Sequence, residues 1–270
     1  MRLLCVGLSL WIAVAIAQTQ SASEKIYPVP RTADGKPDLT GVYQPASNRR
    51  GTWEEGNIDQ SANPAGRPAQ AQAGARAPRR EPAPYQPWAA KKVLDSFNRR
   101  AIDDPTAFCK KPGVPRVASV GLFPMQIIQT PKTIVMIYEY MDSYRTIAMN
   151  SRHPDDLEPS FMGDSVGRWE GDTLVVDVSG FNDKTWLIGV GTFHTEALHV
   201  TERYTMADRD MINYEATMED PKVLTKPWVY RTTIMRREGT RLREYECEEN
   251  NQDPAQYEKL LKDESVFRRQ

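Results

Sequence analysis

From Ser119 to Glu246 the chain alternates apolar and polar residues over short stretches that are separated by turn residues. Such period-two alternation is typical of β-strands with one buried face. Turn signals recur roughly every 10 residues, which is the spacing of a β-meander. The stretches run over Met125–Gln129, Thr133–Tyr140, Tyr144–Met149, Gly167–Trp169, Thr173–Val178, Leu198–Tyr204, Met211–Met218, Val229–Arg236 and Arg241–Glu246.

These stretches predict an all-β fold with minor α, in the form of an antiparallel up-and-down β-barrel. A doubly wound α/β fold is disfavoured because no long helices stand between the strands. A β-sandwich is the alternative, but the successive strands have the spacing of hairpins, which favours the barrel. A closed barrel of about eight strands has no exposed sheet edge and has room for one small ligand.

Two helices are expected beside the strands. A run that begins at Pro87 places Leu94, Phe97 and Ala101 on one apolar stripe, and Asp104-Pro105 ends it. We expect this element to be a packing helix with no chemistry of its own. A short C-terminal helix is expected from Asp253 to about Leu261.

The N-terminus has the pattern of an export signal. Arg2 supplies a positive charge, an apolar run continues to Ile16, and Ala15-Ile16-Ala17 fits the small-x-small cleavage rule. We therefore expect a signal peptide over residues 1–17, a periplasmic or secreted location, and no integral membrane span in the mature chain. An uncleaved anchor is the alternative, but the apolar run is shorter than the roughly 20 residues that a span needs.

The rest of the chain divides into three parts. Residues 18–58 form an N-terminal extended segment with turn chemistry at Asp34-Gly35. In residues 59–87, 16 of the 29 positions are Ala, Pro or Gly, so this Pro/Ala-rich segment lacks the apolar surface to offset chain entropy and is expected to be flexible. Residues 88–270 are expected to form a single β-barrel domain with its flanking helices.

Cys109 and Cys247 remain once the signal, which contains Cys5, is removed. An even pair of cysteines in an oxidising compartment favours a disulfide between them. Two unrelated buried thiols are the alternative. Zinc binding is disfavoured because neither cysteine belongs to a C-x-x-C pair.

Charge and motif content exclude several classes of protein. The 35 Lys plus Arg residues balance 36 Asp plus Glu, and the formal charge of −1 gives no basic surface for nucleic acid. No P-loop, dinucleotide-binding glycine pattern or EF-hand is present, so no cofactor is expected. Ser165 lies in a Gly-x-Ser-x-Gly phrase, but the strand–turn–helix context of a hydrolase nucleophile is missing.

The run from Met162 to Asp183 contains the phrases Gly-Arg-Trp-Glu-Gly-Asp-Thr-Leu-Val-Val and Gly-Phe-Asn-Asp, and His194-Thr-Glu196 follows it. This signature resembles a large family of exported bacterial proteins that has no settled activity. The resemblance covers most of the mature chain except the Pro/Ala-rich segment. Asp164 and Thr195 replace an aromatic residue and a serine that are common in the relatives. The hairpin pattern is also similar to lipocalin-like (calycin) barrels, a likeness of architecture only.

His194 and Glu196 are the candidate catalytic residues. They precede a predicted strand, in which residues two apart share a face, and a carboxylate can orient an imidazole for proton transfer. We expect both side chains to line one polar pocket at a mouth of the barrel; the alternative is that they fix a loop against the barrel. A metal site of His153, His194 and Glu196 is a further alternative, although no H-x-x-x-H or H-E-x-x-H spacing supports it.

Large aromatic residues near the signature are expected to wall an apolar ligand cavity, and Arg203 could anchor a carboxylate. The alternative is that these aromatic residues belong to the core. The expected ligand-binding residues are Trp169, Phe181, Asn182, Trp186, Arg203, Tyr214 and Trp228.

The favoured hypothesis is an exported lipocalin-like protein that binds a small, mostly apolar molecule in its barrel. Its partner would be a small-molecule ligand and not nucleic acid. One alternative is an enzyme on the same scaffold, an isomerase, cyclase or hydrolase that uses His194 and Glu196 for acid–base chemistry. The other alternative is a structural or interaction protein of the cell envelope.

Overall fold

The computed structural model describes residues 27–45, 83–119, 123–189 and 191–249, together with residues 251–252, 255–256, 259 and 262. The expected signal peptide over residues 1–17 lies outside these residues, as does most of the segment over residues 59–87. Most of the expected C-terminal helix from Asp253 to Leu261 lies outside them as well.

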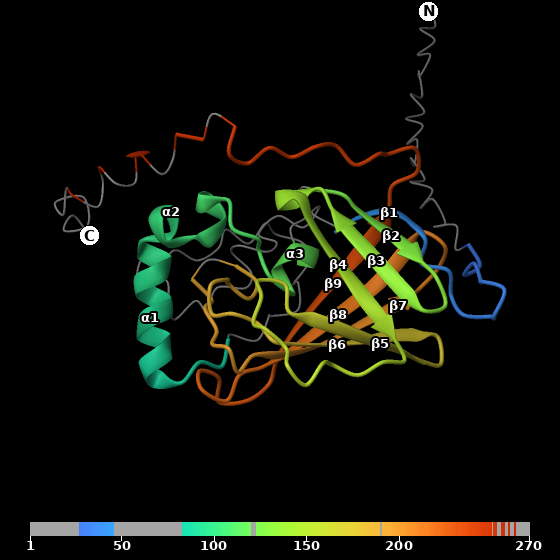
Figure 1. The fold of residues 1–270 in the computed structure, drawn as a ribbon, viewed down its shortest axis with the longest axis horizontal. Helices are drawn as coiled ribbons and strands as arrows, with labels where there is room; N and C mark the ends of the chain where they lie inside the picture. Colours follow the sequence, from blue (N-terminus) through green and yellow to red (C-terminus); the bar gives the residue numbers. More distant parts are fainter. Residues whose placement is uncertain are drawn as a thin grey trace, which may run out of the picture.

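Nine strands in the described part of the chain close into one β-barrel (Figure 1). Each strand pairs with the next along the chain, and β1 also pairs with β9 to complete the closure. The predicted barrel is therefore confirmed. The strands are β1 (Gly41–Pro45), β2 (Met125–Gln129), β3 (Thr133–Tyr138), β4 (Ser143–Met149), β5 (Asp164–Glu170), β6 (Thr173–Ser179), β7 (His199–Met206), β8 (Met211–Glu219) and β9 (Trp228–Arg236).

One pair of neighbouring strands departs from the expected antiparallel meander. β4 and β5 run parallel, with Ile147 opposite Ser165 and Met149 opposite Gly167. A hairpin cannot join parallel strands, so the chain between β4 and β5 must return along the barrel before β5 begins. Glycine allows the two strands to approach, because a Cβ at Gly167 would lie 2.8 Å from the Met149 sulfur.

Short helices stand beside the barrel, and α1 lies next to one end of it (Figure 1). The predicted flanking helix is observed as α1, which buries Ala89 and Val93. It ends earlier than expected because Arg99 leaves the helical conformation, and a separate short helix follows. The helical elements are α1 (Pro87–Asn98), α2 (Arg100–Asp103), the 3₁₀ turn η2 (Pro105–Phe108), α3 (Arg116–Ser119) and the 3₁₀ turn η3 (Tyr140–Asp142).

The last residues of the expected flexible segment pack on the barrel. Ala83 is buried, and the Tyr85 hydroxyl donates to the Phe193 carbonyl at 2.8 Å. The Tyr85 ring also stacks on the Phe193 ring, with centroids 5.8 Å apart. The expected boundary at Pro87 is therefore too late, because Tyr85 brings the apolar surface that the residues before it lack.

The predicted strand over Arg241–Glu246 is wrong, since these residues belong to no strand. Both edges of β9 are already paired, with β8 and with β1, so the ladder has no position left for another strand. The segment instead runs outside the barrel (Figure 1), where the Arg243 amide donates to a Glu139 carboxylate oxygen at 2.8 Å. The predicted disulfide between Cys109 and Cys247 is present and ties the end of this segment to the residue after η2.

Inward-facing side chains of the strands form the core of the barrel. Methionine is prominent among them and among the residues that close the ends. Because its side chain is unbranched and flexible, methionine fills irregular space and can repack around a new neighbour. Seven of the ten methionines lie among the buried residues that the structure describes: Met125, Met136, Met141, Met149, Met162, Met206 and Met218.

Candidate functional site

An arginine and a glutamate form a buried ion pair inside the barrel. Arg145 on β4 and Glu202 on β7 occupy inward positions, and their exposed fractions are 4% and 0%. Arg145 Nη1 donates to Glu202 Oε2 at 2.5 Å, and Nη2 donates to Oε1 at 2.9 Å. Removing both charges from water costs free energy that their attraction does not reliably recover. A pair of this kind is therefore a candidate for function.

Three tyrosine hydroxyls complete this site. Tyr204 on β7 and Tyr214 on β8 donate to Glu202 Oε1 at 2.9 and 2.7 Å. Arg145 Nη2 donates to the Tyr204 hydroxyl at 2.8 Å, and Arg145 Nε donates to the Tyr138 hydroxyl of β3 at 3.2 Å. Tyr138, Arg145, Glu202, Tyr204 and Tyr214 are called the barrel cluster below.

Burial and the ion pair fix the protonation of the barrel cluster. Burial by itself lowers the pKa of Arg145, but the charge of Glu202, the two neighbouring tyrosines Tyr138 and Tyr204, and the hydrogen bond to Glu202 together outweigh burial and raise this pKa well above its usual value. Burial, followed by the charge of Glu202, raises the pKa of Tyr204 and of Tyr214 well above the ordinary tyrosine range. The tyrosines therefore remain neutral hydrogen-bond donors around one positive and one negative charge.

A signal for the barrel cluster is present in the sequence. Arg145 alternates with buried Ile147 and Met149, and Glu202 follows buried Val200 by two positions. Charged residues are rarely fully buried unless they are paired. Two opposite charges on the inward faces of amphipathic strands therefore indicate a pair inside the barrel, although alternation alone does not say which strands bring them together.

His194 is buried and held as a neutral ring. Its exposed fraction is 2%, and Nδ1 donates to the Thr195 carbonyl at 3.0 Å. Because a carbonyl only accepts, the proton is on Nδ1, and Nε2 accepts from the Thr185 hydroxyl at 2.6 Å. Burial lowers the pKa of His194, which keeps the ring neutral. Its two nitrogens therefore stabilise the loop before β7 through one hydrogen bond each.

Glu196 does not join His194 in a pocket. It is exposed and lies in a turn, because β7 begins only at His199. Residues two apart share a face in an extended strand, and the turn removes that condition. The expectation that the two side chains line one polar pocket is therefore wrong. The loop instead packs on α1: Gly191 has a φ of +81°, and a Cβ there would lie 2.8 Å from the Val93 carbonyl oxygen.

The residues of the metal alternative are also apart. His153 contacts Asp164 and Asp177 on the outer face of the barrel, whereas His194 is buried in the loop before β7. Within the described part of the chain, no group of three or more His, Cys, Asp or Glu side chains is arranged to hold a metal ion.

Three of the predicted ligand-binding residues lie on the inward side of barrel strands, and a fourth, Arg203, lies on the outward face of β7. Tyr214 faces inward in the barrel cluster. Trp228, at the start of β9, is buried, and its ring meets that of Tyr85 edge-on at 6.5 Å. Trp169 of β5 is partly buried and packs against the core.

The other four predicted ligand-binding residues do not lie on the inward faces of the strands. Phe181 and Trp186 are buried in the loop between β6 and β7, where Phe181 meets the His194 ring edge-on. In the same loop, the Asn182 side chain accepts from the Lys184 amide. Arg203 donates to Glu170 at 2.9 Å near the surface, so it is not an anchor inside the barrel.

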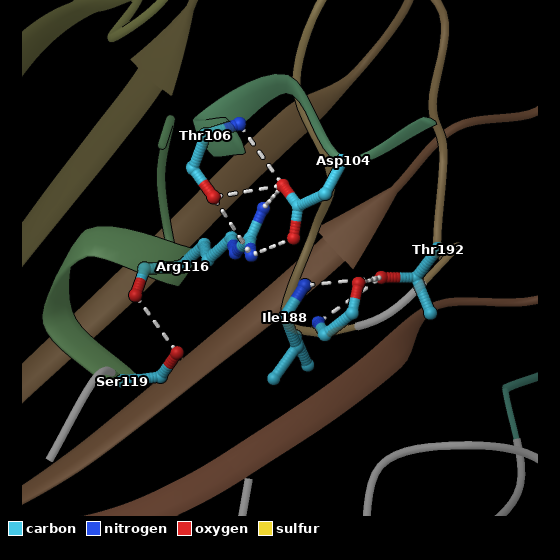
Figure 2. Close-up of polar contacts among 7 residues, drawn as sticks. Asp104, Thr106, Arg116, Ser119, Ile188 and Thr192 are labelled. Atoms are coloured by element: carbon cyan, nitrogen blue, oxygen red, sulfur yellow. Dashed lines mark hydrogen bonds and ion pairs between the residues drawn. The ribbon is translucent and has the colours of Figure 1, made fainter. Parts of the chain in front are cut away.

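A second ion pair, in which Arg116 is buried and Asp104 is partly buried, holds the helical region (Figure 2). Arg116 of α3 donates to both Asp104 carboxylate oxygens, at 2.8 and 2.7 Å, and Asp104 also accepts from the Thr106 amide at 3.0 Å. Burial opposes ionisation of Asp104, but the hydrogen bonds and charge of Arg116 lower its pKa overall.

In the loop before β7, the Thr192 hydroxyl accepts from the Ile188 amide at 3.2 Å (Figure 2).

Replacing Asp104 by Asn is expected to lower the free energy of unfolding near neutral pH by about 1.5–3 kcal/mol, since charged hydrogen bonds are lost. A lowered folded pKa gives stability that is present above the unfolded pKa and is lost as the pH falls through the folded value. The difference between wild type and Asp104→Asn should therefore shrink on acidification, as followed by urea unfolding. A difference that does not depend on pH would contradict this assignment.

A chain of histidines and carboxylates crosses the outer face of the barrel. His153 Nδ1 lies 2.5 Å from Asp164, and its Nε2 lies 2.8 Å from Asp177. The other Asp177 oxygen lies 2.8 Å from His199 Nε2, and His199 Nδ1 lies 3.5 Å from Glu219. Burial alone would lower the pKa of His153, but the hydrogen bonds to Asp177 and Asp164 raise it overall, because only the protonated ring donates to both.

Replacing His153 by Gln is expected to destabilise the protein by about 1 kcal/mol or less, because the site is partly exposed. A raised folded pKa gives stability that is fully present below the unfolded value of 6.5 and is lost as the pH rises through the folded value. Unfolding of wild type and variant should thus differ in mildly acidic buffer and converge in alkaline buffer. Asp177, which both histidines contact, has a lowered pKa and remains ionised across this range.

In the residues that the structure describes, we find no helix long and apolar enough to cross a membrane.

Comparison with known proteins gives one structural likeness. No family model matches the chain, and no curated protein matches it. Among solved structures, a crystal structure of a variant of the fluorescent protein UnaG is similar to 54% of this chain over 89% of its own length, with 14% sequence identity and a TM-score of 0.27. A TM-score this low supports no conclusion about the fold or the function of this protein. The barrel is established by the strand pairing alone.

Proposed function

We propose that this protein is an exported binding protein that holds a small, mostly apolar molecule inside its barrel. The observation that carries the proposal is the barrel cluster, a set of charged and hydroxyl groups in an interior that otherwise consists mainly of aliphatic, methionine and aromatic side chains. Binding sites for small molecules are mostly apolar and contain a few placed polar groups that orient the ligand.

The methionine content of the interior supports entry of a ligand. Met136, Met206 and Met218 lie on the inward faces of β3, β7 and β8, the strands that also supply the three tyrosines of the barrel cluster. Such side chains can repack around a guest at small cost, whereas a core of branched residues resists it. A ligand is therefore expected to displace methionine side chains and leave the strands in place.

Export is part of the proposal and rests on two supports. The first is the signal-peptide pattern of residues 1–17. The second is the disulfide between Cys109 and Cys247, a bond that persists in oxidising compartments and is rare in the cytosol. Cell fractionation that finds the full-length chain in the cytoplasm would contradict this part.

A titration with Nile red, a neutral apolar dye, tests binding inside the barrel. Ligand-stripped wild type is expected to give a saturable rise in fluorescence with one dye per chain. Ala216 lies on the inward face of β8 directly opposite Glu202, so Ala216→Leu should reduce the affinity by filling the interior. The matched control is Ala148→Leu on the outward face of β4, which should bind as wild type does.

Two results would contradict the proposal. One is a rise in fluorescence that does not saturate. The other is equal binding by Ala216→Leu and Ala148→Leu when circular dichroism shows both to be folded. The enzyme alternative receives no support from the arrangement of His194 and Glu196, because the first is buried and the second is exposed.

A further inference from the structure

One member of the barrel cluster donates its proton to a sulfur atom. The Tyr138 hydroxyl lies 3.3 Å from Met136 Sδ, two residues away on the same inward face of β3. Arg145 Nε already donates to the Tyr138 oxygen at 3.2 Å, so the tyrosine's own proton is directed to the sulfur. Both Met136 and Tyr138 are buried, with exposed fractions of 0% and 3%.

The sulfur is the weakest acceptor in the cluster. A thioether accepts hydrogen bonds poorly, whereas Tyr204 and Tyr214 donate to a carboxylate oxygen. Arg145 Nη2 also approaches Met136 Sδ at 3.5 Å, but its two protons are directed to Glu202 and to Tyr204. An oxygen in the place of the sulfur would therefore give Tyr138 a much better acceptor.

The charge of the cluster restricts what that oxygen can belong to. Arg145 and Glu202 already neutralise each other in a bidentate pair. A carboxylate ligand would place a second negative charge beside Glu202 with no second cation among the cluster residues, and burying an unpaired charge is costly. A neutral acceptor adds no charge and needs only one donor.

From this we infer that the ligand carries a neutral carbonyl group on an apolar body, and that its oxygen takes the place of Met136 Sδ as the acceptor of the Tyr138 hydroxyl. The inference rests on the proposed function, since it assigns the chemical class of the molecule that the barrel holds. When the ligand binds, the Met136 side chain moves aside by rotation about its three rotatable bonds, and the Arg145–Glu202 ion pair stays intact. Tyr138 is thus the residue that determines specificity, and Met136 occupies its site when no ligand is bound.

Competition against Nile red with three matched probes tests the assignment: 2-decanone, decane and decanoate. For wild type, 2-decanone should displace the dye at a concentration about three- to tenfold lower than decane, the worth of one hydrogen bond. Decanoate should compete less well than 2-decanone. In Tyr138→Phe, the ketone should lose its advantage over decane.

Two further variants test whether the effect of Tyr138→Phe comes from the lost hydrogen bond to the ligand or from a change in folding. Met136→Leu removes the competing sulfur and should keep or enlarge the advantage of the ketone. Tyr43→Phe removes another buried hydroxyl, one that accepts from Arg236 outside the barrel cluster, and should leave the ketone-to-decane ratio as in wild type.

The outcomes separate this inference from the proposed function. Equal competition by ketone and decane, stronger competition by decanoate, or a ketone advantage that survives Tyr138→Phe would overturn the inference, while saturable dye binding would still support the barrel as a binding site. If Nile red does not bind the wild-type barrel at all, both the proposed function and the inference fail.

Discussion

Replacing Glu202 by Leu is expected to lower the free energy of unfolding by about 3–5 kcal/mol, because it leaves the buried charge of Arg145 without its partner. The substitution also removes the acceptor of the Tyr204 and Tyr214 hydroxyls. The guanidinium cannot avoid the cost by losing its proton, since arginine stays charged under any ordinary condition. Chemical unfolding followed by circular dichroism measures the effect.

The double variant Arg145→Met/Glu202→Leu is the control for this prediction. Replacing both members of a buried pair by apolar residues of similar volume is often neutral or stabilising, so it should recover the part of the loss that comes from the unpaired charge. The Tyr204 and Tyr214 hydroxyls still lack their acceptor in this variant. Tyr214→Phe, which removes one hydrogen bond to the Glu202 carboxylate, should cost less, about 1.5–3 kcal/mol. If Glu202→Leu is as stable as wild type, the pair is not held as described.

Removing the disulfide by Cys109→Ser/Cys247→Ser is expected to destabilise the protein by about 4–5 kcal/mol in the chain-entropy account of cross-links. The bond joins residues 138 positions apart, and a long closed loop restricts the unfolded chain strongly. It also holds the segment after β9 against the η3 turn, where the Tyr245 ring meets that of Tyr140 edge-on. Thermal unfolding with and without reductant measures the loss.

Reduction of the wild-type protein should reproduce the effect of the double serine variant, and reductant should leave that variant unchanged. Dye binding should persist in the folded fraction of both, because the disulfide lies outside the barrel cluster. Equal melting temperatures for oxidised and reduced protein would contradict the prediction.

The strands were predictable because their inward positions repeat with period two. In β4 the buried residues alternate strictly with exposed ones from Ser143 to Met149, and in β7 burial also alternates from His199 to Met206. The pattern fails at Arg241–Glu246, which alternates as a strand does but finds no partner. Alternation of apolar and polar residues indicates that a segment is able to form a strand. Whether it does so also depends on a free strand edge in the assembled sheet.

Local sequence spacing also failed to predict the arrangement of His194 and Glu196. His194 and Glu196 have the spacing of residues on one face of a strand, but the chain turns between them and His199. The Asp220 carboxylate, 25 positions along the chain, holds that turn by accepting from the Thr195 amide at 2.7 Å. No local pattern contains this contact, so no reading of residues 194–196 alone could place the two side chains.

The sequence by itself determined the barrel and favoured the pairing of the two cysteines, because these depend on local alternation and on the number of cysteines available. The alternation around Arg145 and Glu202 also agrees with inward positions, but neither residue was predicted to belong to the site. The tertiary structure alone decided that Arg145 meets Glu202, 57 positions away and on a strand that is not its neighbour. It also decided that β4 and β5 run parallel and that Met136 lies against Tyr138. Contacts across a barrel follow from closure, since the curvature of the whole sheet brings inward side chains of distant strands together.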